Sequence, residues 1–202
     1  RMKKRAPGVR YAEEERETQE TRVRVVLDLD GERTPSIETG IGFFDHVLGL
    51  MVFHGGFDCG ISAEGDLDVD DHHTVEDVGI CFGRALRSAI GDAEGISRFG
   101  SECVPMDEAL VMACVDVSGR PYVAFDVPFS HDRIGDLNTD CIEQFFRAVS
   151  NNAGIPIHIR SFAGKNNHHL CEATFKAFGR ALRRAVARTD GTGVPSTKGS
   201  LD

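Results

Sequence analysis

Two short clusters of histidine and glutamate are the residues of this chain best suited to do chemistry. Residues 71–76 read Asp-His-His-Thr-Val-Glu, and residues 167–172, 96 positions later, read Asn-His-His-Leu-Cys-Glu. The similarity continues downstream, because 10 of the 20 positions in 71–90 are identical to their counterparts in 167–186. Four of the 8 histidines therefore lie in a duplicated pattern, which predicts an internal repeat.

Each cluster has the spacing of metal ligands on a helix. Residues three or four apart share a helical face, whereas direct neighbours point about 100° apart. His72 and His73 are therefore expected to serve different ions, and Glu76 is able to join either. Imidazole with carboxylate and no thiolate suits Mn, Fe, Co, Ni or Zn. The duplicated clusters predict a pair of metal sites that draw ligands from both repeats or from two subunits.

Composition limits the class of protein. The 202 residues are enough for one sizeable domain or two small fused ones. A net charge of −9 argues against binding to nucleic acid or to an anionic membrane surface. The chain contains no apolar run of 18 residues and no apolar stretch of a secretory signal near its basic start. We therefore expect a cytoplasmic protein.

The 6 cysteines are scattered, and no pair has the Cys-x-x-Cys spacing. Most of them lie in apolar runs, which favours buried free thiols in a reducing compartment.

Hydrophobic periodicity predicts the order of the elements. Strands are expected at 22–30, 36–41, 58–63, 109–117, 122–127 and 155–161. Helices are expected at 43–52, 72–90, 140–153 and 168–187. The strands 109–117 and 122–127 read as a hairpin-like pair.

This order predicts an α+β fold built by internal duplication of a β-β-α-β-α unit, with two-layer halves of sheet and helix packed together. The first repeat would span 21–97 and the second 98–190. Residues 1–20 form a charged segment that is expected to be mobile. Residues 191–202 are rich in Gly, Pro, Ser and Thr and are expected to form a flexible loop.

Further polar residues extend the candidate site. His46 follows Asp45 near a predicted helix start, and the repeat aligns it with Gln144 at an offset of 98. The alternative is that Asp45 caps the helix and His46 is merely exposed. Several cations at loop edges or on the second long helix could gather an anionic group, although each could also be an ordinary surface charge. These cations are Arg98, Arg120, Lys165, Lys176 and Lys198.

The tail sequence Pro-Ser-Thr-Lys-Gly at 195–199 suits phosphate capture, although it lacks the order of a Walker A loop. Patterns for a serine hydrolase or a dinucleotide-binding fold are also absent from the sequence.

Taken together, these segments resemble the imidazoleglycerol-phosphate dehydratase family of histidine biosynthesis. The segments that carry the resemblance occur in the family's order along nearly the whole chain, at 40–46, 70–77, 98–100, 105–109, 118–122, 164–169, 172–177 and 195–199. The resemblance implies a Mn²⁺ enzyme with two ions per active site. It also implies a homo-oligomer of 24 subunits built from trimers, with active sites between subunits.

The resemblance also assigns roles to single residues. The metal ligands would be His46, His72, His73, Glu76, Gln144, His168, His169 and Glu172. Substrate would be bound by Glu20, His46, Arg98, Arg120, Lys176, Ser196, Thr197 and Lys198. Glu20 resembles a mobile acid that closes over the substrate. The family commonly has histidine where this chain has Gln144, and an amide oxygen is a poorer ligand than imidazole, which predicts weaker binding at one metal site.

The implied reaction removes water from D-erythro-imidazole-glycerol phosphate to give imidazole-acetol phosphate. The carbon that loses its hydroxyl lies next to an imidazole ring, so metal ions on the ring would act as Lewis acids. Candidate proton carriers are Glu20, Glu76 and Glu172, among which the sequence does not choose. The alternatives are a dinuclear metallohydrolase that acts on a phosphorylated small molecule and a non-catalytic metal-binding assembly protein.

Overall fold

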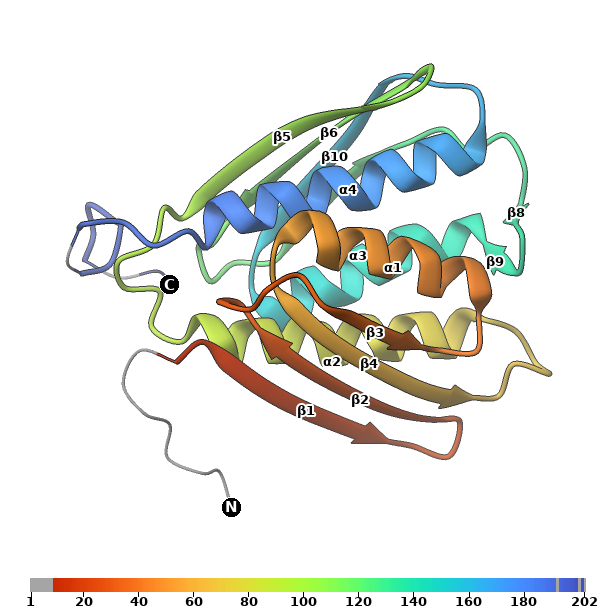
Figure 1. Cartoon of the computed structure of the whole chain (residues 1–202), viewed down its shortest axis with the longest axis horizontal. Coiled ribbons are helices and arrows are strands. Elements are labelled where there is room, and N and C mark those ends of the chain that lie inside the picture. Colours follow the sequence, from red (N-terminus) through yellow and green to blue (C-terminus); the bar gives the residue numbers. More distant parts are fainter. Residues whose placement is uncertain (1–8, 192, 200, 202) are drawn as a thin grey trace.

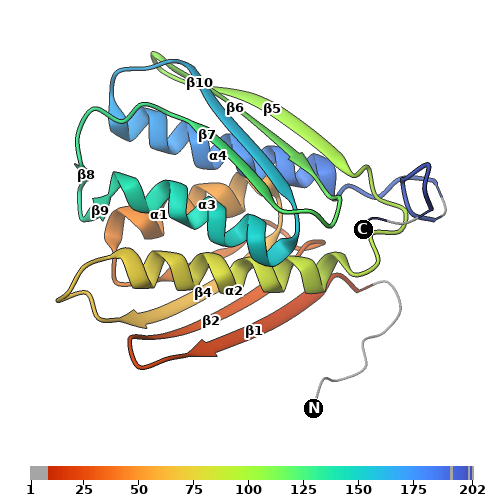
Figure 2. The same ribbon diagram turned by 180° about the vertical axis from the view of Figure 1, so that it is seen from behind.

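The computed structural model describes residues 9–191, 193–199 and 201. Two four-stranded sheets form the outer layers, and four helices fill the space between them (Figures 1 and 2). The first sheet contains β1 (Tyr11–Glu17), β2 (Thr21–Asp28), β3 (Pro35–Glu38) and β4 (Asp58–Gly65). The second contains β5 (Phe99–Met106), β6 (Ala109–Asp116), β7 (Tyr122–Asp126) and β10 (Pro156–Ala163). The helices are α1 (Gly42–Gly55), α2 (His72–Ile90), α3 (Thr139–Ala153) and α4 (Asn167–Ala185).

The two halves repeat the same topology, which confirms the α+β class and the duplication. The strand orders are β1-β2-β4-β3 and β5-β6-β10-β7, and in each sheet the last pair is parallel. A short hairpin of β8 (Arg133–Ile134) and β9 (Leu137–Asn138) is inserted before α3. The observed unit is thus β-β-β-α-β-α, with one strand more than the sequence predicted.

The additional strands are β1 and β5, which carry little hydrophobic signal. Only one residue is buried in each of them, Ala12 in β1 and Gly100 in β5, so their sequences lack the alternation expected of a strand. Both are held instead by antiparallel pairing with β2 and β6 along their whole length. The prediction of a mobile segment is therefore wrong for residues 11–17, while residues 1–8 lie outside the described residues.

The predicted hairpin of 109–117 with 122–127 is also wrong. Strand β10 lies between β6 and β7, antiparallel to the first and parallel to the second. A strand that arrives 30 residues later thus separates two neighbours in sequence, which periodicity alone does not reveal. The described residues of the tail contain no helix or strand, and the flexibility of the tail stays a prediction.

The prediction of buried free thiols is confirmed for four cysteines. All six are free, and Cys59, Cys81, Cys141 and Cys171 are buried, whereas Cys103 on β5 is exposed and Cys114 is partly buried. In the part of the chain that the structure describes, no helix is both long and apolar enough to cross a membrane. The cytoplasmic location stays a prediction.

The helices pack across the two halves. Helix α1 of the first half lies along α4 of the second, and α3 of the second half lies along α2 of the first (Figure 2). Phe145 lies at the centre of the shared core, with its ring against Phe44, Phe146 and Phe175. The core is therefore common to both halves.

Two repeat-related glycines permit the closest helix contacts. A Cβ atom on Gly83 of α2 would lie 2.8 Å from the carbonyl oxygen of Val149 on α3. A Cβ atom on Gly179 of α4 would lie 2.3 Å from the carbonyl oxygen of Met51 on α1. The glycine of the repeated Phe-Gly-Arg sequence thus sets how near each long helix approaches the other half.

We predict that Gly179→Ala lowers the free energy of unfolding by about 2 kcal/mol, because the new methyl group has no room against α1. Gly49→Ala on α1 is the matched control, since its Cβ would meet nothing within 4 Å. Helix propensity alone should raise the stability of this control by roughly 0.5–1 kcal/mol. Urea unfolding followed by circular dichroism measures both, and equal effects of the two substitutions would contradict the predicted close contact.

Candidate functional site

All four helices begin at the same end of the molecule (Figures 1 and 2). Side chains from one half secure helix starts of the other. Asp136 in the β8–β9 turn accepts hydrogen bonds from the backbone N–H groups of Gly42 and Phe43 at the start of α1. Asp71, just before α2, accepts hydrogen bonds from the backbone and the side chain of Asn138. The ends that carry the histidines are therefore fixed relative to each other.

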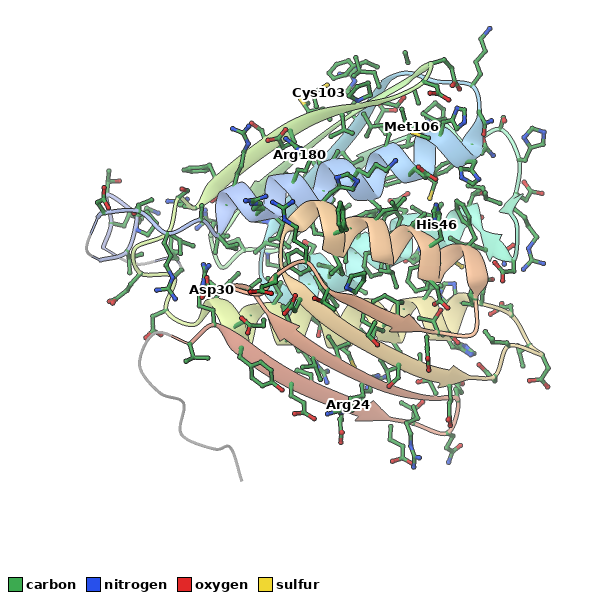
Figure 3. All side chains as sticks on the ribbon, in the orientation of Figure 1. Arg24, Asp30, His46, Cys103, Met106 and Arg180 are labelled. Atoms are coloured by element: carbon green, nitrogen blue, oxygen red, sulfur yellow. The ribbon has the colours of Figure 1, made fainter. Side chains whose placement is uncertain are left out.

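Three predicted ligands meet at this end. His46 on α1 and His168 on α4 place their Nε2 atoms 2.8 and 2.9 Å from Oε1 of Glu172 on α4 (His46 is labelled in Figure 3). One ligand atom from each of the three residues lies within 4.8 Å of the others. The carboxylate is buried, whereas both imidazoles are about half exposed. This set, called the main cluster below, has the donors of a divalent metal site.

Asp45 does not cap α1, which excludes the alternative explanation of the Asp45-His46 pair. Its carboxylate accepts hydrogen bonds from the backbone and hydroxyl of Thr39, so it stabilises the turn before the helix. His46 in turn belongs to the main cluster.

Lys176 completes the charge balance of the main cluster. Its Nζ lies 2.6 Å from Oε2 of Glu172 and 3.4 Å from Sδ of Met106. Burial would raise the pKa of Glu172, but hydrogen bonds from His46, Lys176 and His168 outweigh it and lower the pKa to about 2. Glu172 is therefore a firmly ionised carboxylate, and Lys176 contacts the main cluster as well as being a candidate for the substrate.

The first repeat offers a second, looser set. His72 and Glu76 lie on the same face of α2, with 3.8 Å between Nε2 and Oε2. Gln144 lies on α3, which packs along α2 as α1 packs along α4. It therefore occupies the position in the second half that His46 occupies in the first.

The second histidine of each pair contacts a carboxylate that lies outside the two ligand sets described above. Nδ1 of His73 lies 3.1 Å from Asp66 and 3.8 Å from Glu20, and Nδ1 of His169 lies 2.6 Å from Glu108. The hydrogen bond with Asp66 raises the pKa of His73, and that with Glu108 raises the pKa of His169. As the helical spacing predicted, neighbouring histidines do not share one set of ligand atoms.

The remaining substrate candidates lie at the opposite end of the helices. The backbone N–H of Arg98 donates to the carbonyl of Ala185, the last residue of α4, and its guanidinium contacts Asp116 and the carbonyl of Pro195. Ser196 and Lys198 follow in the tail, joined by a hydrogen bond from the Lys198 N–H to the Ser196 hydroxyl. At 1.5 Å per residue, α4 separates this group from Glu172 by about 20 Å. Thr197 and Arg120 are exposed in the tail and in the β6–β7 loop.

The chain is similar to known proteins of one family. Residues 39–182 match the profile of the family described as imidazoleglycerol-phosphate dehydratase. The chain belongs to this family. A dehydratase of that name from Moorella thermoacetica is 54% identical over 188 residues, which cover 93% of this chain and 96% of the relative. One from Caldicellulosiruptor saccharolyticus is 49% identical, with 96% and 100% covered.

Solved structures of dehydratases of this family share the fold. The crystal structure from Staphylococcus aureus is 40% identical with a TM-score of 0.80, and it covers 89% of this chain and 99% of that one. The structure from Pyrococcus furiosus is 37% identical with a TM-score of 0.80, and it covers 93% and 100%. The family resemblance inferred from the sequence is thereby confirmed.

Two carboxylates that form hydrogen bonds with the histidines were not predicted from the sequence. Glu108 lies within the segment 105–109 that carried the resemblance, but nothing in its spacing connected it with His169. Asp66 directly follows β4 in an acidic stretch and gave no distinct signal. Both become apparent only when the folded chain brings the strand ends to the helix starts.

The charge balance of the main cluster predicts a dependence of stability on pH. The pKa of Glu172 in the folded chain is about 2 and lies below its ordinary value of 4.5, so the unfolded chain takes up the proton first as pH falls. The stabilisation is complete above about pH 5 and is lost toward pH 2. The free energy of unfolding of the metal-free protein should therefore fall more steeply below pH 5 than that of Glu172→Gln. Urea unfolding between pH 3 and 7 measures both, and parallel curves would refute the assignment.

Proposed function

We propose that this chain removes water from D-erythro-imidazole-glycerol phosphate to give imidazole-acetol phosphate in histidine biosynthesis, and that it needs two Mn²⁺ ions per active site. The main cluster carries the proposal, because His46 comes from one half of the chain and His168 and Glu172 from the other. Family membership supports the same reaction, since the relatives bear the name of this dehydratase.

The residues present fit a divalent metal ion. His46, His168 and Glu172 supply two imidazoles and one carboxylate to the first ion, a donor set that suits Mn²⁺ and related metals. His72, Glu76 and Gln144 supply the pseudo-equivalent set for the second. In His73 and His169 the Nδ1 atom faces a carboxylate, which leaves Nε2 to complete sites in other copies of the chain.

The separation of the two groups supports sites between subunits. Arg98, Ser196 and Lys198 lie about 20 Å along α4 from Glu172, which is too far for one small phosphorylated substrate. The cations of one copy must therefore meet the metal ligands of another if both serve the same substrate. This requirement favours a homo-oligomer, and the family resemblance implies that it is a shell of 24 subunits built from trimers.

The chain's own residues position the substrate and its protons. Bound ions would act as Lewis acids on the substrate's ring. Arg98, Arg120 and Lys198 would hold the phosphate by charge-assisted hydrogen bonds, together with the Ser196 and Thr197 hydroxyls. Lys176, fixed to Glu172, would add positive charge near the ligands.

Among the three carboxylates, Glu20 is the best placed to carry a proton. Glu172 has a pKa of about 2 and three hydrogen-bond donors, so it is a poor proton acceptor. Glu76 belongs to the second ligand set. Glu20 is exposed in the turn between β1 and β2, and its carboxylate lies 3.8 Å from His73. We assign Glu20 to take the proton from the second carbon of the side chain, while the hydroxyl leaves as water from the carbon beside the ring.

One assay separates this proposal from its alternatives. The purified protein is incubated with imidazole-glycerol phosphate, with Mn²⁺ or after chelation, and the absorbance of the enolised product is followed. Metal-dependent absorbance supports the dehydratase. Release of inorganic phosphate would instead indicate the metallohydrolase, and Mn²⁺ binding without turnover would indicate a non-catalytic assembly protein.

Removal of metal should reduce the size of the oligomer. Ligand sets that are shared between copies leave imidazoles and carboxylates facing one another without an ion, which is costly at an interface. We expect smaller oligomers after chelation and return of the large one on addition of Mn²⁺. Light scattering coupled to gel filtration gives the masses, and a mass unchanged after exhaustive chelation would argue against interfacial sites.

Loss of the phosphate-binding cations should impair substrate binding. Lys198→Ala should raise KM more than about 10-fold because a charge-assisted contact disappears, while metal content stays normal. Arg98→Ala should act at least as strongly, since Arg98 also holds the carbonyl of Pro195. Arg24→Ala is the control, because Arg24 pairs with Glu13 on the surface of the first sheet. Wild-type kinetics for both Lys198→Ala and Arg98→Ala would refute the assigned pocket.

Gln144 should make one metal site weaker than the other. A neutral amide oxygen replaces an imidazole nitrogen, so Gln144→His should increase Mn²⁺ affinity and activity at limiting Mn²⁺. If Gln144 only orients a neighbouring ligand, the same change brings no gain or a loss. Activity titrations with Mn²⁺ decide between the two, and superimposable curves would remove the reason to call this site impaired.

A further inference from the structure

The turns between the first two strands of each half carry equivalent glutamates. Glu20 immediately precedes β2, and Glu108 immediately precedes β6. Because the sheets have the same strand order, the two turns occupy corresponding places beside the starts of α2 and α4. Each glutamate also faces Nδ1 of the second histidine in its own half, His73 or His169.

Glu108 is fixed in this place. Its Oε2 lies 2.6 Å from Nδ1 of His169, and its Oε1 accepts the backbone N–H groups of Lys165 and Asn166 at 3.2 and 2.9 Å. These hydrogen bonds join the β5–β6 turn to the segment that leads into α4.

In the first half, Asp66 rather than Glu20 makes the hydrogen bond with the second histidine. Both carboxylate oxygens of Asp66 lie 3.1–3.2 Å from Nδ1 of His73, whereas Glu20 is farther away at 3.8 Å. The backbone N–H of Asp66 also donates to the carbonyl of Glu20. Asp66 therefore connects His73 with the β1–β2 turn. The Glu20 carboxylate is not needed to orient His73.

The second half has no carboxylate that corresponds to Asp66. Gly65 and Gly164 are matched, because a Cβ atom on them would meet Thr74 and Leu170, which the repeat aligns. The next residue is Asp66 in the first half and Lys165 in the second. A cation thus takes the place of the carboxylate, and His169 depends on Glu108.

We propose that Asp66 and Glu108 are positioning residues that hold His73 and His169 with the proton on Nδ1, and that Asp66 releases Glu20, the repeat counterpart of Glu108, for a catalytic role. A carboxylate that accepts the Nδ1–H fixes both the tautomer and the ring orientation, which presents Nε2 as the ligand atom. The inference rests on the proposed function in that it concerns the metal ligands.

The test compares Glu108→Ala, Glu108→Gln and Asp66→Asn with Glu20→Gln in the full chain. Glu13→Gln is the control, since it removes only a carboxylate that pairs with Arg24 on the sheet surface. Mn²⁺ affinity is measured from the electron paramagnetic resonance signal of free Mn²⁺. The tautomers of the histidines are read from ¹⁵N shifts of the ring nitrogens in metal-free protein labelled at histidine.

We expect Glu108→Ala to weaken Mn²⁺ binding by about 10- to 100-fold. We expect Glu108→Gln and Asp66→Asn to weaken it less, because an amide oxygen still accepts one hydrogen bond. The ¹⁵N shifts of His169 or His73 should move toward a mixture of tautomers. Glu20→Gln should lower kcat with Mn²⁺ affinity and both tautomers unchanged.

Wild-type affinity and unchanged ¹⁵N shifts in Glu108→Ala would overturn the positioning role. A loss of Mn²⁺ affinity in Glu20→Gln as large as in Glu108→Gln would overturn the division of roles. If wild-type protein binds no Mn²⁺, the metal-dependent function fails, and the ¹⁵N shifts alone then decide whether the carboxylates set the tautomers.

Discussion

The packing of each long helix against the short helix of the other half is the constraint on which the site depends. Helix α4 needs α1 beside it before Glu172 can meet His46, and Gly179 makes that approach close enough. Helix α2 meets α3 in the same manner at Gly83. Neither half alone forms the main cluster, so the duplicated chain has to fold as one unit to assemble its chemistry.

The electrostatics of the helix starts follow from this packing. Four helix N-termini at one end of the molecule create a region of positive potential, which favours carboxylates. Asp136 accepts N–H groups at the start of α1, and Asp71 accepts hydrogen bonds from Asn138 just before α3. Glu172 and Glu108 contact imidazoles instead. Histidines held in this way are oriented before any ion arrives, so little rearrangement is needed to bind one.

The sequence predicted those parts of the structure that depend on local pattern. The strong helical period placed α2 at His72–Ile90, and the repeated motif contains His168 and Glu172, two of the three residues of the main cluster. Strands β1 and β5 were missed, because β-ladder pairing holds them without a buried face. The carboxylates Asp66 and Glu108 were missed as well, since their contacts join turns to helices 7 and 61 residues away. Long-range contacts of this kind leave no periodic trace.

Divergence between the halves has a consequence for recognition. Two identical halves would offer a bound imidazole ring two equivalent ligand sets, and the rest of the substrate could then extend in either direction with equal free energy. This chain differs at three matched positions: His46 against Gln144, Asp66 against Lys165, and Glu20 at 3.8 Å from His73 against Glu108 hydrogen-bonded to His169. Each difference changes the free energy of one orientation relative to the other. Under the proposed function the substrate is asymmetric and carries a single phosphate, so only one orientation of its side chain would bring the carbon that loses the proton to Glu20.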